Sequence, residues 1–308
     1  MDILTEAVAS MRSESPRTAR TECRAPWGLR FHEATGAAFH VVLAGSCWLV
    51  RPDGSSLALA AGDVIFLRSG AEHALTDDPD SPATDFRPDR TDRTSPIGRF
   101  AIDGPGARTV LLCGSYHLDQ ERPHPLVAGL PEMIHLPARR DRHHALRAAI
   151  DMLGAELDDP RPGSDGIVGE LIDLLLLYIL RAWLDDQPAD ATAGWAAALT
   201  DPAIAPALRA IHRDPGRAWT VESLADSAGL SRAAFARRFT GLVGEPPLTY
   251  LTRWRMTTAA RLLRHSDTPI AVVGERVGYG SEFAFAKAFK RAHSVPPGQY
   301  RRRAGAAS

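Results

Sequence analysis

Two short segments near the C-terminus carry side chains of the kinds that recognise base pairs. Arginine can pair with guanine through two hydrogen bonds, and an apolar edge can meet the methyl group of thymine. The matching positions of the two segments therefore predict contacts with base edges. The candidate DNA-binding residues are Arg232, Ala233, Ala236, Arg237 and Thr240 in the first segment, and Glu282, Phe283, Ala286, Lys287 and Lys290 in the second.

Two helices with the same internal pattern must position these side chains. The segments Ser231–Phe239 and Ser281–Phe289 are offset by 50 residues, and both read Ser, then Ala-Phe-Ala, then a basic residue, then Phe. A serine hydroxyl can accept a hydrogen bond from a free N–H of the first helical turn, so both serines are predicted N-caps. The phenylalanines at i and i+4 form one stripe, and the candidate residues lie on the opposite face.

A shorter helix is predicted before each of these segments. Val221–Ala225 leads to a turn at Gly229, and Ile270–Gly274 leads to a turn at Gly278. Helix, glycine turn and capped helix make up the helix-turn-helix, whose second helix enters the major groove of DNA. A single amphipathic helix is more often a plain solvated face. The tandem repeat favours DNA recognition over that alternative.

Charge divides the chain near the same place. Residues 199–308 contain 17 Lys and Arg against 8 Asp and Glu, a net charge of +9. Residues 1–198 carry −10, and the whole chain of 308 residues carries −1. A basic unit is the electrostatic pattern of polyanion binding. The charge therefore predicts double-stranded DNA as the partner of the C-terminal part, independently of the motifs.

Many residues in the C-terminal third of the chain match the pattern of one family of DNA-binding domains. These residues are Trp219–Glu222, Leu224–Ala225, Gly229–Arg232, Phe235, Phe239, Gly244, Pro247, Tyr250–Leu251, Arg255–Met256, Ala259–Ala260, Leu262–Leu263, Val277–Tyr279, Phe289–Arg291 and Pro297–Tyr300. With them, residues 199–303 resemble the DNA-binding domain of the AraC family of transcription regulators. The resemblance implies two recognition helices joined by one helix, roughly Pro247 to Arg264. Glu282 is acidic and would lie near the phosphates or bases of DNA. The second helix is therefore expected to add less specificity than the first.

Residues 27–76 are predicted to form short strands. Segments 39–43, 46–50, 56–59 and 63–67 are apolar and are separated by Gly, Pro and Asp, and 109–113 adds a later strand. Short, regularly spaced strands suggest a small β-barrel or jelly roll. Roughly residues 18–135 resemble the cupin-like sensor domain of many AraC-family regulators; the resemblance is carried by Phe39-His40, Leu43-Ala-Gly45, Gly62-Asp63, Gly70 and His73.

His40 and His73 are the candidate ligand or metal residues. Cupins often hold a metal through histidines lining the barrel, so the resemblance implies this pair, with His32 or His117 as a possible third ligand. The enzyme-type first motif, His-x-His with a downstream Glu, is absent around His40, and catalytic zinc sites usually have three protein ligands. Bound metal, effector contacts and ordinary buried histidines stay open. The missing ligands argue against a cupin dioxygenase or isomerase.

Cys23 and Cys113 are the redox candidates. Cys23 lies in a polar stretch beside Arg24, which would lower its pKa and favour the thiolate. Cys47 and Cys113 are expected in strand cores, where cysteines are usually inert. A redox switch would need Cys23 to reach Cys113 within the spacing that a disulfide tolerates. Three cysteines are too few for a disulfide framework.

Two long helices are predicted over 141–157 and 164–185. The second has a broad apolar face, and core packing and a dimer seam explain it equally well; the face consists of Ile167, Leu171, Leu174, Leu175, Tyr178 and Ile179. Asp173 and Arg181 interrupt the apolar run, so it is not predicted to span a membrane. The Pro-, Asp- and Arg-rich segment 77–96 is predicted to be a mobile loop.

The predicted fold is α+β, with an N-terminal small β-barrel followed by helices and a C-terminal all-α domain holding two helix-turn-helix units. The expected parts are a sensor domain at 1–135, a helical connector or dimerisation region with a linker at 136–190, and the DNA-binding domain at 199–303. The predicted function is a sequence-specific transcription regulator responding to a small molecule or redox signal. The alternative is a cupin-type metalloenzyme with a DNA-binding tail. Activation and repression are not distinguished.

The remaining expectations concern partners, chemistry and location. The chain is expected to bind double-stranded DNA, to form a homodimer and to take a small-molecule effector. No catalytic residue and no cofactor is predicted, apart from the metal considered at His40 and His73. Residues 1–22 lack the apolar segment of a signal peptide, so a cytoplasmic location is expected.

Overall fold

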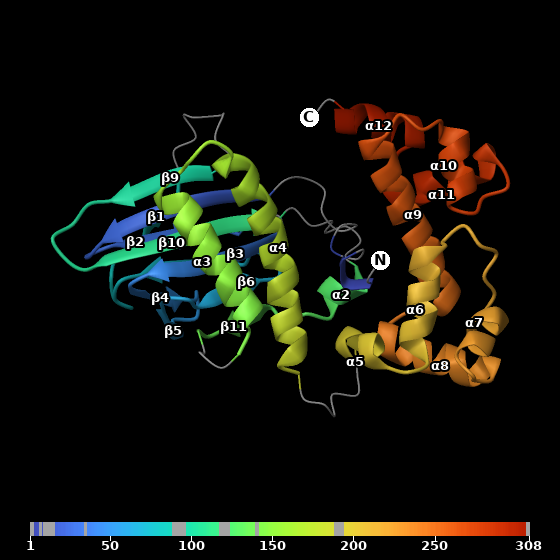
Figure 1. Cartoon of the computed structure of the whole chain (residues 1–308), viewed down its shortest axis with the longest axis horizontal. Coiled ribbons are helices and arrows are strands. Elements are labelled where there is room, and N and C mark those ends of the chain that lie inside the picture. The colour runs from blue at the N-terminus through green and yellow to red at the C-terminus, as the bar shows by residue number, and fades with distance from the viewer. Residues whose placement is uncertain are drawn as a thin grey trace. The chain divides into compact units, whose positions relative to one another are not determined.

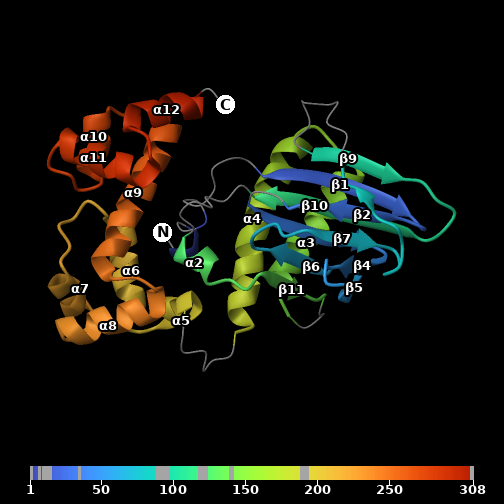
Figure 2. The same cartoon turned by 180° about the vertical axis from the view of Figure 1, so that it is seen from behind.

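The computed structural model describes residues 3–5, 8, 16–33, 36–87, 97–116, 124–138, 142–187 and 194–305. The chain divides into two units, which Figures 1 and 2 draw from opposite sides. The sheet unit consists of Arg12–Pro123 and Leu130–Gln187, and the helical unit of Met1–Met11, His124–Gly129 and Pro188–Ser308. No helix in the described parts of the chain is long and apolar enough to cross a bilayer.

Two mixed sheets form the sheet unit. One has the strand order β11-β6-β3-β10-β1-β9 and the other β5-β4-β7-β2-β8. The strands expected at 39–43, 46–50, 56–59 and 63–67 are confirmed as β3 to β6. The bounds are β1 Arg17–Arg24, β2 Gly28–Phe31, β3 Ala37–Ala44, β4 Ser46–Val50, β5 Ser56–Ala60, β6 Val64–Leu67, β7 His73–Thr76, β8 Thr84–Asp85, β9 Ile97–Ile102, β10 Arg108–Tyr116 and β11 Met133–Leu136.

The core of this unit lies between the two sheets. Side chains alternate across a strand, so every second residue of each strand points inward. Leu29, Leu49 and Leu75 are paired in register across β2, β7 and β4 of one sheet, and Val42 and Leu111 come from β3 and β10 of the other. All five belong to one buried cluster. The predicted cupin-like fold class is confirmed.

Helices α3 (His144–Asp158) and α4 (Ser164–Asp185) pack beside the six-stranded sheet (Figure 1). The hydroxyl of Tyr116 on β10 donates a hydrogen bond to the carbonyl oxygen of Ile172 on α4, at 2.8 Å. All of β6 is buried, as expected for a strand covered on both faces. On α4, Leu171 and Leu175 are buried, whereas 47% of Ile167 and 41% of Leu174 are exposed. The predicted apolar face is therefore partly core and partly exposed.

The loop expected to be mobile at 77–96 is ordered over its first half. Strand β8 lies in it, and the ring of Phe86 packs 4.6 Å from that of Phe31. Asp77 accepts hydrogen bonds from the backbone N–H of Trp27 and the hydroxyl of Ser81, both at 2.8 Å. The prediction is wrong for 77–87, because its polar side chains hydrogen-bond the turn and Phe86 joins the core. Residues 88–96 lie outside the described part.

The helical unit contains two helix-turn-helix pairs, α7 with α8 and α10 with α11. Helix α9 joins them, close to the predicted 247–264. The bounds of the helices in this unit are α2 Pro125–Ala128, α5 Gly194–Thr200, α6 Ile204–Arg213, α7 Val221–Ser227, α8 Arg232–Val243, α9 Pro247–His265, α10 Ile270–Arg276, α11 Glu282–His293 and α12 Pro297–Gly305.

The local signals read from the repeats are confirmed. Ser231 and Ser281 cap α8 and α11 by accepting hydrogen bonds from the N–H groups of Ala234 and Ala284. The phenylalanine stripes are fully buried. A Cβ atom added to Gly274 would lie 3.0 Å from the Cβ of Phe285, so a glycine is what allows α10 and α11 to approach.

Candidate nucleic-acid interface and sensor core

Both recognition helices expose the faces that the sequence predicts. On α8, Ala236 is half-buried and the other four candidates are exposed, namely Arg232, Ala233, Arg237 and Thr240. On α11, Ala286 is half-buried and the exposed candidates are Glu282, Phe283, Lys287 and Lys290. The buried phenylalanines fix the rotation of each helix, because they occupy the opposite face. That these ten residues contact DNA stays a prediction.

Phe283 is the most exposed large apolar side chain of the described residues. The exposed fraction of its side chain is 81%. The ring of Phe283 is therefore held in solvent rather than packed into the fold. An apolar ring held in solvent beside Lys287 has the chemistry to meet a thymine methyl group in a groove.

The side chain of Arg238 binds another residue of the helical unit and does not project freely from the exposed face of α8. Its Nε and Nη2 atoms donate hydrogen bonds to Oδ2 of Asp201, at 2.9 and 2.5 Å. The other carboxylate oxygen of Asp201 accepts from the N–H groups of Ala203 and Ile204 at the start of α6. Asp201 thus connects the first turn of α6 to α8. The side chain of Arg237 makes no hydrogen bond or ion pair with any described residue, so its guanidinium is available.

A cluster of aromatic rings supports the first half of the helical unit. The ring of His212 on α6 stacks on Trp254 of α9 at 3.8 Å, and its Nε2 lies 2.5 Å from the hydroxyl of Tyr250. His124, just before α2, is buried with its ring 4.9 Å from that of Trp195 on α5. No local sequence pattern predicts this cluster, because its members are far apart in the chain and follow no period.

Helix α9 sets the spacing between the two recognition helices. A helix of 19 residues is about 28 Å long at 1.5 Å per residue. Helix α8 packs near one end and α11 near the other (Figure 1). This length approaches the ~34 Å of one turn of DNA, which separates neighbouring major-groove segments on one face.

Known proteins share both parts of this architecture. The Cupin family model matches residues 2–185, and the Helix-turn-helix domain model matches residues 224–303. An AraC-like transcription regulator of Streptomyces lividans is 35% identical over 98% of each chain. The chain belongs to the AraC family of transcription regulators. The regulator AlkR of Acinetobacter baylyi is 30% identical over 98% of this chain and 99% of its own.

A solved structure also resembles the AraC-type helical unit. The DNA-binding domain of the global transcriptional factor AdpA, solved with a target DNA, is 34% identical. It covers 35% of this chain and 96% of its own chain, with a TM-score of 0.33.

In the cupin unit of this AraC-family chain, His40 and His73 meet in the core. Their Nε2 atoms lie 2.7 Å apart, and the ring of Phe31 stacks on His73 at 4.9 Å. Burial and the neighbouring His73 hold the pKa of His40 well below its usual value, and burial also lowers the pKa of His73. Both rings are therefore neutral near pH 7.

The backbone defines the tautomer of this pair. Nδ1 of His73 donates to the carbonyl oxygen of Ala71 at 2.7 Å, so its Nε2 carries a lone pair. His40 must then donate through Nε2, which leaves its Nδ1 as an acceptor. That Nδ1 is buried and has no hydrogen-bond partner among the described residues. The pair is thus an incompletely satisfied polar site inside the barrel.

The two proposed third ligands do not join this pair in the described structure. His32 instead lies on the surface, with Nε2 2.9 Å from Oδ1 of Asp85. His117 lies outside the described residues. Within the described ranges no cluster of three metal-ligating side chains occurs.

The expected lowering of the Cys23 pKa by Arg24 is wrong. Burial raises the pKa of Cys23 to about 12. Strand alternation turns Cys23 into the core, while its neighbour Arg24 is exposed on the other face. Burial also raises the pKa of Cys113, and Cys47 behaves likewise, with a pKa of about 12. All three thiols are protonated and buried, which disfavours reaction with oxidants.

Strand register also separates the two redox candidates. Cys23 lies opposite Thr109, whereas Cys113 lies opposite Ala19, four residues away along β1. At about 3.4 Å per residue the two Cα atoms are roughly 14 Å apart along the strand, beyond the roughly 7 Å limit for a disulfide. A bond between Cys23 and Cys113 would require the strands to slide or separate.

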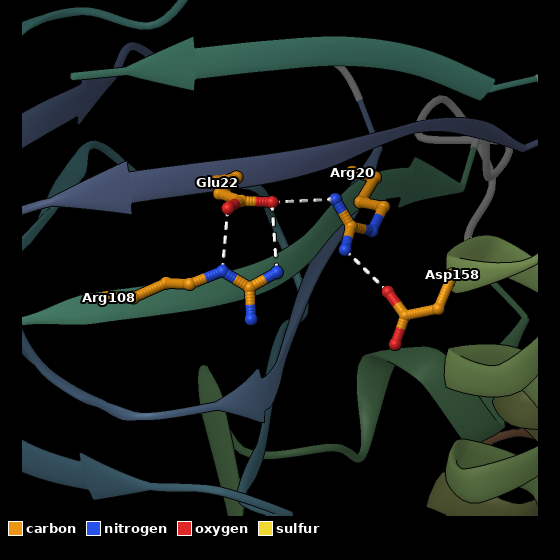
Figure 3. Close-up of polar contacts among 4 residues, drawn as sticks. All are labelled: Arg20, Glu22, Arg108 and Asp158. Atoms are coloured by element: carbon orange, nitrogen blue, oxygen red, sulfur yellow. Dashed lines mark hydrogen bonds and ion pairs between the residues drawn. The ribbon is translucent and has the colours of Figure 1, made fainter.

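On the outward face of β1, an ion-pair network extends to α3 (Figure 3). Arg108 binds the carboxylate of Glu22 through Nε at 2.6 Å and Nη2 at 3.0 Å, and Arg20 reaches it at 3.2 Å. Nη2 of Arg20 also lies 2.5 Å from Oδ1 of Asp158 at the end of α3. These hydrogen bonds, the one from Arg108 first, lower the pKa of Glu22 to about 2.

Proposed function

We propose that this AraC-family regulator recognises a specific DNA sequence by placing α8 and α11 in successive major-groove segments. The observation that carries the proposal is the pair of capped helices, each with a buried phenylalanine stripe and an exposed opposite face. In this proposal the principal base contacts are Arg237 on α8 and Lys287 with Phe283 on α11. Glu282 reduces the contribution of α11 to base recognition, because nearby phosphates repel its carboxylate.

A footprint on the DNA upstream of the regulator's own and adjacent genes tests this proposal. The full chain should protect two segments about one helical turn apart, because α9 holds the two recognition helices at that spacing. If the wild-type chain protects only one segment, α11 takes no part in base recognition.

We further propose His40 and His73 as the site where the cupin unit detects its effector or a metal. Two neutral imidazoles with facing Nε2 atoms suit either a hydrogen-bonding ligand or a borderline transition metal such as Zn²⁺. The hydrogen bond from His73 to Ala71 supports this role, since metal-bound histidines usually donate their other N–H to an acceptor. A redox signal through Cys23 and Cys113 is the weaker option, given their burial and register.

Titration of the purified full chain with Co²⁺ tests the metal option through its visible absorption. Binding that is lost in His73→Gln supports ligation at this pair. Absorption that is unchanged in His73→Gln places the metal elsewhere and leaves the pair to an organic effector.

The regulator is also proposed to act as a homodimer through α3 and α4, in the cytoplasm and without enzymatic activity. The exposed apolar residues on these helices support the dimer, namely Met152 on α3 and Ile167 and Leu174 on α4. The relatives named above are transcription regulators, which supports a function without catalysis. The metalloenzyme alternative has no support among them.

A further inference from the structure

A pocket lies on the side of the five-stranded sheet that faces away from the core. Strand register defines this face: Arg30 pairs with Ala74, and Val50 pairs with the same Ala74, whereas the neighbouring Leu29 and Leu75 point into the core. Arg30, Val50, Ala74 and Thr76 all line the pocket. Its volume of about 480 Å³ falls in the range of small-molecule sites.

The wall of this pocket is an ordered part of the chain. Pro79, Ser81, Pro82 and Ala83 form one side, and the hydrogen bonds of Asp77 described above hold this segment in place. A Cβ atom added to Gly28 on β2 would lie 2.5 Å from the carbonyl oxygen of Pro82. The absence of a side chain at Gly28 is thus what lets the wall close against the sheet.

Polar side chains that line the pocket have donors and acceptors that form no hydrogen bond or ion pair with the described residues. Thr76 is 1% exposed, and its Oγ1 is buried without a hydrogen-bond partner in the described structure. Arg30 forms no ion pair with any described residue. The guanidinium of Arg51 contacts the hydroxyl of Ser55 at 3.1 Å and the sulfur of Met133 at 3.4 Å, neither of which neutralises it.

The net positive charge of the side chains that line the pocket favours a negatively charged ligand. Two arginines line the pocket against one carboxylate, that of Glu72. A buried hydroxyl left without a partner is costly, and a ligand oxygen beside it would satisfy it. Hydrogen bonds between a guanidinium and a carboxylate or phosphate are among the strongest in proteins.

We propose that this outer pocket binds a small organic anion through a carboxylate or phosphate group held by Arg30 and hydrogen-bonded to Thr76. The site adjoins the pair of His40 and His73, since His73 also lines the pocket and His40 does not. It shares strand β7 with that pair, because His73 and Thr76 are the two ends of the same four-residue strand. The regulator would therefore carry a second ligand site that adjoins the histidine pair.

Isothermal titration of the full chain with citrate and with glycerol 3-phosphate tests the proposal and separates the two anion chemistries. At least one probe should bind saturably at micromolar to millimolar concentration. Arg30→Ala should weaken that binding by ~10-fold or more, as expected for a lost charge-assisted hydrogen bond. Thr76→Val keeps the shape of the side chain but removes the hydroxyl, and it should weaken binding by a factor of about 3 or more.

The matched control is Arg24→Ala, which removes an exposed arginine of the same unit that does not line the pocket. It should leave the affinity within about twofold, because screened surface charge contributes little. The proposal is overturned if neither probe binds, if Arg30→Ala binds like the wild type, or if Arg24→Ala weakens binding as much as Arg30→Ala. None of these outcomes bears on DNA recognition by α8 and α11, which is measured separately.

Discussion

Arg237 and Arg238 are adjacent on α8, yet their guanidinium groups face different surroundings. Arg238 is bound to Asp201, whose other oxygen caps α6, whereas Arg237 projects from the exposed face without a partner in the described chain. Successive helical residues are turned by about 100°, which is enough to separate the two environments.

Arg237→Ala should lose roughly 1–3 kcal/mol of discrimination and relax the preference at one base position, because a bidentate arginine–guanine pair is worth that much. Arg238→Ala should instead weaken binding to all sequences alike, since it loosens α8 from α6. Competition binding over a base-substituted operator series distinguishes the two. If Arg237→Ala retains the wild-type preference at every position, α8 does not read bases through this residue.

The sequence predicted the environment of some of these residues and not of others. The spacing of Ser231, Phe235 and Phe239 fixes which face of α8 is exposed, since cap and stripe are local features. The partner of Arg238 lies 37 residues earlier in the chain, and no local pattern reveals such a contact. The same holds for Cys23, whose inward direction depends on the register of β1 rather than on its charged neighbours.

At the scale of elements, the approach of α10 to α11 depends on Gly274. Gly274→Ala should destabilise the helical unit by about 1–3 kcal/mol, because the new Cβ would press on the fully buried ring of Phe285. Gly241→Ala is the matched control, since its Cβ would meet nothing within 4 Å on α8. It should stabilise by about 0.5–1 kcal/mol through its better helix propensity. Denaturant unfolding of both variants measures the difference, and equal shifts would contradict the close contact.

The ion-pair network of Glu22 makes the sheet unit sensitive to acid. The folded-state pKa of Glu22 is about 2, below its ordinary value of 4.5. Its stabilisation is therefore present above pH 4.5 and is lost as the pH falls toward 2. Glu22→Gln should lower the melting temperature at pH 7 and reduce the difference in melting temperature between pH 5 and pH 3. Melting curves that keep the wild-type pH dependence in Glu22→Gln would show that the network does not contribute.

At the scale of the whole molecule, local sequence patterns predict most helices and strands. They do not predict which segments that are distant in the sequence pack together. The strands, the two helix-turn-helix pairs and α9 follow from periodicity, caps and glycine turns. That His124–Gly129 belongs to the helical unit could not be predicted, because the segment lies between β10 and β11 in sequence. The outer pocket was missed for a related reason: Arg30, Val50 and Thr76 come together through strand register. The domain limits at 135 and 199 stay predictions.

The proposed dimer makes a prediction about the assembly. Leu174→Asp should shift the full chain from dimer to monomer in sedimentation at micromolar concentration, because a charge in an apolar interface is unpaired. Leu248→Asp is a close control, since both leucines are 41% exposed and Leu248 lies on α9. A wild-type chain that sediments as a monomer, or equal effects of both substitutions, would exclude the α4 interface.

Specific recognition of DNA by the intact chain is the central claim, and site selection from a random DNA pool followed by competition at increasing salt tests it most directly. We expect one enriched sequence, preferred over scrambled DNA by ~10³-fold or more. The logarithm of the affinity should also fall linearly with the logarithm of the salt concentration, because arginine and lysine release counterions from phosphates. Salt-dependent binding with no enriched sequence would contradict specific recognition, because it would leave α8 and α11 as a basic surface that reads no bases.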